Sequence, residues 1–290
     1  MKPLPKFEYH APLTLDDALE LMAELDKAKP IIGGTDLIVA IRQAACTPNH
    51  IVDLNRISDL NYIKEEERFI KIGATTTLSQ VASNPLTDKI SSLHDAVCRI
   101  GSPQIRNRAS ITGNIVNASP AADTAGPLIV HEAELEVKSI DSTNIIPVEE
   151  LFVGPKINCL ESGELITEIR IPIPPENSAS AFKRIGRRKA FTLSVVSSSS
   201  FIRIEDKNCI EARFAFGSIA MIPLRIREIE DLLKGRKLSK ENILLACERV
   251  REYVNPITDV RGTEEYRRDM CPVLMKRTIQ TCIERLGESI

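Results

Sequence analysis

One segment decides the fold: GSPQIRNRASITGNIVNASPAAD, residues 101–123. It is rich in hydroxyl and amide side chains, contains few groups able to do acid–base chemistry, and shows almost no helix or strand periodicity. A long polar loop inside a compact domain is usually either functional or disordered. Apolar residues recur through this one, which argues against disorder. Such a lining suits a ligand that carries many hydroxyl groups and a diphosphate.

A second segment, IIGGTDL at residues 31–37, is predicted to be a buried strand that runs into a double glycine. Glycines there let the backbone turn sharply and direct successive N–H groups at an anion. The alternative interpretation is a tight turn in which Asp36 caps the next helix. No two of the 13 glycines are separated by a single residue. The Rossmann and kinase glycine motifs are therefore absent, as is GxxxxGK[ST], and a nucleotide would have to bind by another route.

Charge and hydropathy exclude several classes of partner. The chain has 290 residues, with 38 basic and 40 acidic side chains and a net charge of −2. This balance offers no basic field for a phosphate backbone, so we expect no nucleic-acid partner. Residues 1–10 contain no apolar core of a signal peptide, and the apolar stretches are too short to cross a bilayer. We therefore expect a cytoplasmic protein with no membrane partner.

The metal-ligating residue types are scattered along the chain. No two of the seven cysteines lie closer than eleven positions, and there is no CxxC or Cys/His cluster. A structural zinc site or a typical iron–sulfur motif is therefore not predicted. The four histidines show no metal-ligand spacing. We expect surface or core roles for them, no metal site, and free thiols in a reducing compartment.

Local patterns predict a mixture of helices and strands. Thr14 is a helix cap with Asp17 at the third helical position, and Thr77 with Gln80 is a capping box for a short helix to residue 83. Strands are predicted at 30–32, 51–54, 69–72, 131–140 and 209–217, with one long strand or a strand pair at 191–204. Helices are predicted from Pro223 to Gly235, over 240–254 and over 264–286. Without a regular βαβ alternation, this pattern favours an α+β fold.

A domain boundary is predicted at residues 171–180. Their sequence, IPIPPENSAS, has three prolines and too few apolar side chains for a core element. The serine run at 197–200 is interpreted as a strand whose small side chains pack against a neighbour. The basic run at 183–189 has two interpretations: a solvated charged hairpin, or an entry for an anionic dinucleotide.

The two glycine-containing segments resemble motifs of a known family, the FAD-binding subunits of the molybdenum hydroxylases. These are the flavoprotein subunits of xanthine dehydrogenase and carbon monoxide dehydrogenase. The family motifs resemble AGGTDL and GSPQIRNxxTIGGNIxNASPxAD. The similarity continues, in order, through residues 181–183, 216–217, 223–225 and 259–268. It therefore covers essentially the whole chain.

The resemblance implies a fold and a division into domains. Residues 1–177 would form a two-lobed, PCMH-type FAD-binding domain of the vanillyl-alcohol-oxidase superfamily. Residues 178–290 would form an α+β C-terminal domain of antiparallel strands and helices. The flavin ring would rest between the two domains, which agrees with a boundary at the proline-rich linker.

The resemblance also implies cofactor contacts. Residues 31–35 would wrap the FAD diphosphate with backbone N–H groups, and the segment at 110–123 would contact the diphosphate, ribityl and ribose groups. Ile100 would lie near the adenine, Ile166 by the flavin ring, and Lys183 at the polar edge of the ring. The implied cofactor-binding residues are Ile31, Ile32, Gly33, Gly34, Thr35, Asp36, Ile100, Ser110, Thr112, Gly113, Asn114, Asp123, Ile166 and Lys183.

The chain departs from the family pattern at two positions. Thr112 replaces the first of two adjacent glycines before the asparagine, where a positive φ would strain a threonine. Thr112 can still offer its backbone N–H and adds a hydroxyl group. Ile32 replaces a small alanine before Gly33, a change that we interpret as packing.

The resemblance implies an electron-transfer subunit of an oxidoreductase, with no catalytic side chain of its own. Electrons from a molybdenum cofactor in a large molybdopterin subunit would pass through [2Fe–2S] clusters of a small subunit to FAD, and then to NAD⁺ or another acceptor. The alternatives are a stand-alone flavin reductase of the same superfamily and a flavin-free scaffold subunit. A family variant with an extra [4Fe–4S] cluster needs four clustered cysteines, which this chain does not have. The substrate of the molybdenum subunit is not encoded in this chain.

Overall fold

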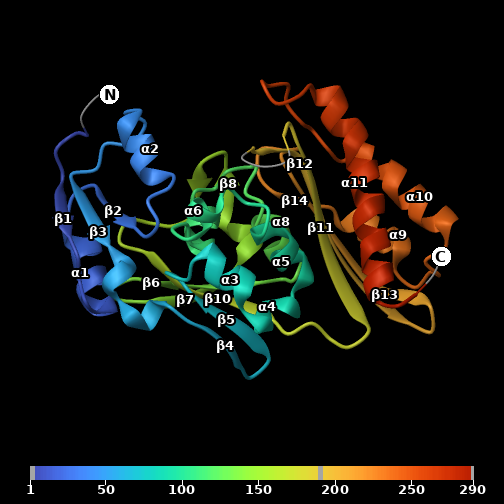
Figure 1. The fold of residues 1–290 in the computed structure, drawn as a ribbon, viewed down its shortest axis with the longest axis horizontal. Helices are drawn as coiled ribbons and strands as arrows, with labels where there is room; N and C mark the ends of the chain where they lie inside the picture. The colour runs from blue at the N-terminus through green and yellow to red at the C-terminus, as the bar shows by residue number, and fades with distance from the viewer. Residues whose placement is uncertain (1–3, 189–191, 289–290) are drawn as a thin grey trace.

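The N-terminal lobe is a small parallel sheet with two helices (Figure 1). The computed structural model describes residues 4–188 and 192–288. Strands β1 (Glu8–His10), β3 (His50–Asp53) and β2 (Ala28–Ile31) pair in that order, all parallel. Helix α1 (Leu15–Glu24) begins where the Thr14 side chain accepts a hydrogen bond from the Asp17 N–H, as the sequence predicts. Helix α2 (Leu37–Arg42) follows the double glycine.

A five-stranded antiparallel sheet forms the centre of the molecule. Its order is β4 (Ile63–Glu66), β5 (Phe69–Gly73), β10 (Leu165–Pro172), β6 (Glu134–Lys138) and β7 (Thr143–Pro147). Short helices pack with it around the largest hydrophobic core. They are α3 (Leu78–Ser83), α4 (Pro85–Asp88), α5 (Ser91–Val97), α7 (Ile111–Val116) and α8 (Ala125–Val130). Helix α6 (Pro103–Arg106) has no buried residue and lies beside α3. A small hairpin pairs β8 (Phe152–Gly154) with β9 (Ile157–Asn158).

The C-terminal part is a four-stranded antiparallel sheet covered by helices (Figure 1). Its strands are β11 (Ser178–Gly186), β12 (Ser194–Glu205), β13 (Asn208–Gly217) and β14 (Leu224–Arg225). The helices are α9 (Arg227–Leu233), α10 (Lys240–Arg249) and α11 (Glu264–Arg285). The serine run of β12 is buried, and the Ser200 and Thr278 hydroxyls lie 2.6 Å apart where α11 crosses the strand. The interpretation of small side chains packed against a neighbour is confirmed.

Most predicted elements are present, including the capping box of Thr77 and Gln80 at the start of α3. Two expectations were wrong in detail. The helix expected from Pro223 begins only at Arg227, because residues 224–225 pair with β13 as a strand. The segment at 101–123 is not a plain loop, since it contains α6 and α7. Of the two alternatives for 191–204, one long strand is confirmed and the strand pair is not: β12 runs from Ser194 to Glu205, and residue 191 lies outside the described residues.

Side-chain contacts link the central part of the molecule to the C-terminal sheet and its helices. The largest core cluster includes Phe201 of β12 and Ala215 of β13. Arg285 at the end of α11 donates to both carboxylate oxygens of Asp95 in α5, at 2.8 and 2.9 Å. Only residues 173–177 of the predicted linker at 171–180 lie between β10 and β11. The expectation that this stretch forms no core element is wrong at its two ends, because Ile171 is a buried residue of β10 and Ser178–Ser180 begin β11. The mixture of helices and antiparallel sheets confirms the α+β class.

Within residues 4–188 and 192–288, no helix combines the length and the apolar character that crossing a bilayer requires.

Candidate cofactor-binding site

A cleft of about 930 Å³ lies between the N-terminal lobe and the central sheet. Ligand pockets in proteins usually have volumes of roughly 300–1,000 Å³, so this cleft suits a large ligand. Three segments form most of its walls: residues 27–37, residues 109–117 and residues 156–166. The first two correspond to the segments that the sequence singles out. Of the third, only Ile166 was predicted.

The first wall is the turn after β2. The Asn55 side-chain amide donates to the Ile32 carbonyl at 2.7 Å, which fixes the end of the strand. Gly34 has φ +69°, a conformation that favours glycine. Residues 33–36 lie outside the helices and strands, and their backbone N–H groups donate no hydrogen bond to a backbone carbonyl among the described residues. Unpaired backbone donors are rare unless water or a ligand accepts from them, so this turn is suited to bind an anion.

The second wall is the first turn of α7. Ser110 caps this helix, because its hydroxyl accepts from the Gly113 N–H at 3.0 Å. The Ala109 carbonyl accepts from the Leu78 N–H at 2.8 Å, which fixes this segment against α3. A Cβ atom on Gly33 would lie 2.1 Å from the Arg108 carbonyl oxygen. The two walls therefore touch through their backbones at Gly33.

The third wall consists of the segment before β10 and the first two residues of that strand. The Asn158 side-chain amide donates to the Val116 carbonyl at 2.8 Å, and the Lys156 N–H donates to the Ala118 carbonyl at 2.9 Å. Gly163 has φ +90° and lies in the turn that leads to β10. Apart from Ile166, this polar turn ahead of an apolar strand is the sequence signal that could have indicated the third wall. Ile166, which the sequence analysis does single out, lies on this wall and is 4% exposed.

Eleven of the fourteen residues implied by the family resemblance line the cleft. They are Ile31, Ile32, Gly33, Gly34, Thr35, Asp36, Ser110, Thr112, Gly113, Asn114 and Ile166. Ile100, Asp123 and Lys183 do not line it. Ile100 packs against the central core, and Lys183 is a half-buried residue of β11.

Asp123 is a buried ion-pair partner of Arg184. The Arg184 guanidinium lies 2.6 Å from one carboxylate oxygen, and the Ser194 hydroxyl donates to the other. Burial raises the pKa of Asp123, and Arg184 opposes this effect. The pair joins the segment after α7 to β11 and β12. The interpretation of the basic run as a solvated hairpin is therefore wrong for Arg184, and Lys189 lies outside the described residues.

Two local expectations about the site need correction. Thr112 is part of α7 and has no positive φ, so the expected strain at this departure from the family pattern does not arise. The Asp36 side chain makes no capping hydrogen bond to α2, although Asp36 is the residue before the helix. The alternative interpretation, in which Asp36 caps the helix, is therefore wrong for this side chain.

The seven cysteines are free thiols, and four of them are buried in the C-terminal part. Burial raises the pKa of Cys209, Cys247 and Cys271 to about 12 each. These thiols stay protonated at neutral pH and act as small apolar core side chains. Within the described residues, no cysteine belongs to a group of three or more side chains that could hold a metal ion.

Fold and cleft together define a class: an α+β nucleotide-cofactor protein whose anion-binding turn has no Rossmann motif. Comparison with known families is more specific. Residues 5–174 match the family described as the FAD binding domain in molybdopterin dehydrogenase. Residues 180–282 match the CO dehydrogenase flavoprotein C-terminal domain. The chain belongs to the FAD-binding subunits of the molybdenum hydroxylases and is an oxidoreductase subunit.

Individual relatives are similar over nearly their whole length. The xanthine dehydrogenase FAD-binding subunit of Escherichia coli O157:H7 is 30% identical over 282 residues, covering 96% of this chain and 97% of that protein. The nicotinate dehydrogenase FAD-subunit of Eubacterium barkeri is 29% identical, covering 97% of each. A chain of carbon monoxide dehydrogenase from Hydrogenophaga pseudoflava superposes with a TM-score of 0.94 at 28% identity, covering 98% of this chain and 99% of that chain.

The residues of the cleft fit FAD. The free N–H groups of the turn at 33–36 can bind the diphosphate, and glycine at two of these positions leaves their donors uncovered by side chains. Around them, Ser110, Asn114 and Asn117 offer hydroxyl and amide groups for a polyhydroxylated chain. The apolar residues Leu165 and Ile166 of β10 line the third wall. Anionic, polar and apolar parts of the cofactor thus each have matching groups.

Proposed function

We propose that this chain is the FAD-carrying electron-transfer subunit of a molybdenum-containing hydroxylase. The observation that carries the proposal is the cleft, in which the turn at 33–36 and the first turn of α7 meet at Gly33. The eleven lining residues named above are the proposed cofactor-binding residues. Ile100, Asp123 and Lys183 belong to the proposal only through the family resemblance. The proposed domains are residues 1–177 and 178–290.

The protein positions and insulates the cofactor rather than reacting itself. The backbone donors of residues 33–36 would hold the diphosphate, and Ser110 and Asn114 would orient the sugar chain. Ile166, buried beside β6, would exclude water from one side of the ring. When bound, FAD supplies the chemistry, since it can take up single electrons and release a hydride. We propose no general acid or base among the side chains of this chain.

The proposed partners are a small subunit with [2Fe–2S] clusters and a large subunit with the molybdenum cofactor. Two observations support them. The matched family is that of molybdopterin dehydrogenases, and no cysteine of this chain belongs to a possible metal-binding group among its described residues. Electrons would then reach FAD from the clusters and leave to NAD⁺ or another acceptor. Seven free thiols fit a reducing compartment, so we also propose a cytoplasmic location.

The first experiment purifies the chain alone and records its absorption spectrum. We expect flavin bands, no iron–sulfur bands, and complete release of flavin to the supernatant on denaturation, because neither glycine segment contains a histidine or cysteine for a covalent link. Colourless protein that does not take up FAD would favour the scaffold interpretation. Yellow colour that stays with the precipitated chain would contradict non-covalent binding.

The second experiment separates a relay from an independent enzyme. A candidate purine or aromatic N-heterocycle is added anaerobically to the isolated chain, and flavin bleaching is followed. We expect no reduction by these substrates, because oxidation needs the molybdenum subunit, whereas NADH can reduce the flavin directly. Rapid bleaching by an organic substrate without any other subunit would overturn the relay and favour an independent flavoenzyme that oxidises the substrate itself.

A further inference from the structure

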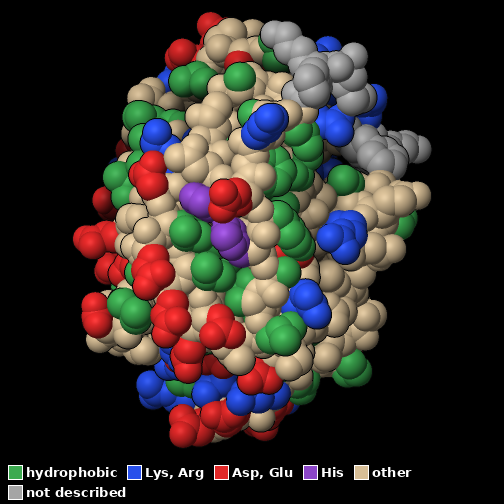
Figure 2. Space-filling model, turned by 90° about the vertical axis from the view of Figure 1, so that its left-hand side faces the viewer, with side chains coloured by type: hydrophobic (Ala, Val, Ile, Leu, Met, Phe, Trp, Pro, Cys, Tyr) green, Lys and Arg blue, Asp and Glu red, His purple; other side chains and the backbone are tan. Residues whose placement is uncertain are grey.

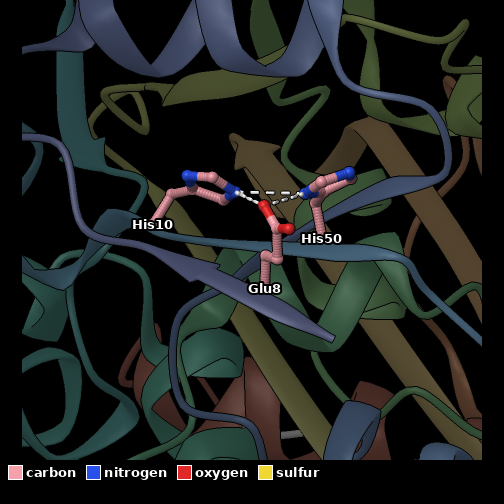
Figure 3. A group of neighbouring side chains, drawn as sticks. All are labelled: Glu8, His10 and His50. Carbon is pink, nitrogen blue, oxygen red and sulfur yellow. Dashed lines mark hydrogen bonds and ion pairs between the residues drawn. The ribbon is translucent and has the colours of Figure 1, made fainter. Parts of the chain in front are cut away.

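Three metal-ligating side chains converge on the N-terminal sheet, outside the cofactor cleft (Figure 3). Glu8 and His10 are two residues apart on β1, so their side chains leave the same face of the strand. His50 begins β3, and its Cα is the register partner of Glu8. The parallel pairing therefore brings His50 together with two residues that lie 40 and 42 positions earlier in the sequence. None of the three lines the cleft.

The three groups present their ligand atoms to one point. His10 Nε2 lies 3.1 Å from His50 Nδ1, and a carboxylate oxygen of Glu8 lies 3.5 Å from His50 Nδ1 and 4.0 Å from His10 Nε2. Figure 3 shows this carboxylate pointing at the space between the two imidazole rings. All three ligand atoms lie within 4.8 Å of one another.

These separations are close to those of a metal centre. Zinc bonds to imidazole nitrogen and carboxylate oxygen are about 2.1 Å long, so neighbouring ligand atoms lie about 3.0–3.4 Å apart for angles between square and tetrahedral. Two of the three observed separations are already within about 0.1 Å of that range. The Glu8 side chain is 75% exposed and is free to move the remaining half ångström.

A hydrogen bond between His10 and His50 accounts for the positions of the two imidazole rings but not for the approach of the Glu8 carboxylate to both of them. Between two neutral imidazoles, one nitrogen donates and the other accepts, so one proton satisfies the His10–His50 pair. A cation instead attracts two nitrogen lone pairs and a carboxylate oxygen at once. The histidine side chains are 25% and 18% exposed, so an ion can reach them from solvent. Figure 2 shows histidine side chains beside an acidic one on the open face of the molecule.

We propose that Glu8, His10 and His50 form a binding site for a divalent first-row transition metal, with Zn²⁺ as the preferred ion. Two imidazoles and one carboxylate suit zinc, copper and nickel better than calcium or magnesium, which prefer oxygen ligands. Three protein ligands leave a coordination position for water. Because β1 is an edge strand that pairs only with β3 in the described sheet, the ion would clip it to its neighbour. The site is independent of FAD binding.

The test uses the full-length chain without a polyhistidine tag, dialysed against a chelator. Zn²⁺ binding is measured by isothermal titration calorimetry, and Co²⁺ is used as a spectroscopic probe of coordination. We expect one Zn²⁺ per chain and a rise in Tm with Zn²⁺, because the ion binds the folded chain only. His10→Ala and His50→Ala should each weaken binding by at least about 100-fold, since loss of a mere supporting group costs 10- to 100-fold.

Two further variants keep the test decisive. Glu8→Gln changes an exposed side chain and should weaken Zn²⁺ binding about tenfold or more while leaving the fold and the flavin content unchanged. His94→Gln is the matched control, because His94 lies 3.6 Å from the Cys98 sulfur and is the alternative nitrogen ligand on the surface. It should bind Zn²⁺ like the parent chain. No Zn²⁺ binding by the parent chain, or equal affinity in Glu8→Gln, His50→Ala and parent, would overturn the proposal.

Discussion

Gly33 is the position where a single methyl group should separate the two walls of the cofactor cleft. In Gly33→Ala the new Cβ would lie 2.1 Å from the Arg108 carbonyl oxygen, 2.6 Å from the Arg108 carbonyl carbon and 2.8 Å from the Ala109 Cα. All three are backbone atoms, so no side chain can rotate away. The clash can be relieved only if the turn at 33–36 and the segment at 108–110 move apart.

The size of this movement sets the expected effect. Carbon atoms in contact rarely approach closer than about 3.0 Å and prefer about 3.5–4.0 Å, so the walls must separate by about 1 Å. Overpacking strain of this kind costs about 1–3 kcal/mol. If the strain falls on the FAD-bound state, the Kd for FAD rises about 5- to 150-fold, at 1.4 kcal/mol per factor of ten.

The assay titrates FAD into the flavin-free chain and measures the Kd, with flavin content after gel filtration as a second measurement. Gly154→Ala is the control, because its Cβ would lie 3.6 Å from an Ile157 side-chain atom, an ordinary contact, and Gly154 does not line the cleft. We expect this control to bind FAD like the parent chain. If Gly33→Ala matches the parent in Kd and in Tm, the backbone contact does not shape the site and the reasoning fails.

Three further predictions concern the site, acid stability and the ion pair between the sheets. Gly113→Val should lower flavin content far more than Thr112→Val. The added side chain at position 113 would press on the Ser110 cap, whereas Thr112→Val removes a buried hydroxyl that has no partner among the described residues. Equal flavin content in both variants would contradict the proposed contact. Burial, with a smaller effect of Arg213, lowers the pKa of His131 to about 3. The unfolded chain binds this proton near pH 6.5, so the stability contribution is complete above pH 6.5 and is lost as pH falls towards 3, by up to about 1.4 kcal/mol per pH unit. Urea unfolding at several pH values should show a flatter acid limb in His131→Asn, and an unchanged slope would refute this role. Arg184→Met should lower the free energy of unfolding by about 3–5 kcal/mol, because it leaves the buried Asp123 carboxylate unpaired; urea unfolding with no loss would show that the pair is not needed.

Most helices and strands, and two of the three walls of the cleft, could be predicted from short-range sequence patterns. The caps at Thr14 and Thr77 act within three residues, so they can be recognised without any knowledge of the fold. The double glycine and the polar segment at 101–123 are also local signals, and the double glycine and residues 109–117 of that segment line the cleft. The family resemblance then identified the cofactor, because a long ordered motif is specific even where its individual contacts are not known.

Contacts between residues far apart in the sequence were decided only by the tertiary structure. Arg184 looked like part of a solvated basic run, but it is buried against Asp123, 61 positions away. The third wall of the cleft depends on where β10 joins the central sheet, and Pro223 precedes a strand because β13 offers a free edge. His50 meets Glu8 only through the register of two parallel strands. Such pairings follow from how the whole chain packs its core, since local propensity and spacing hold no information about which distant segment supplies the partner.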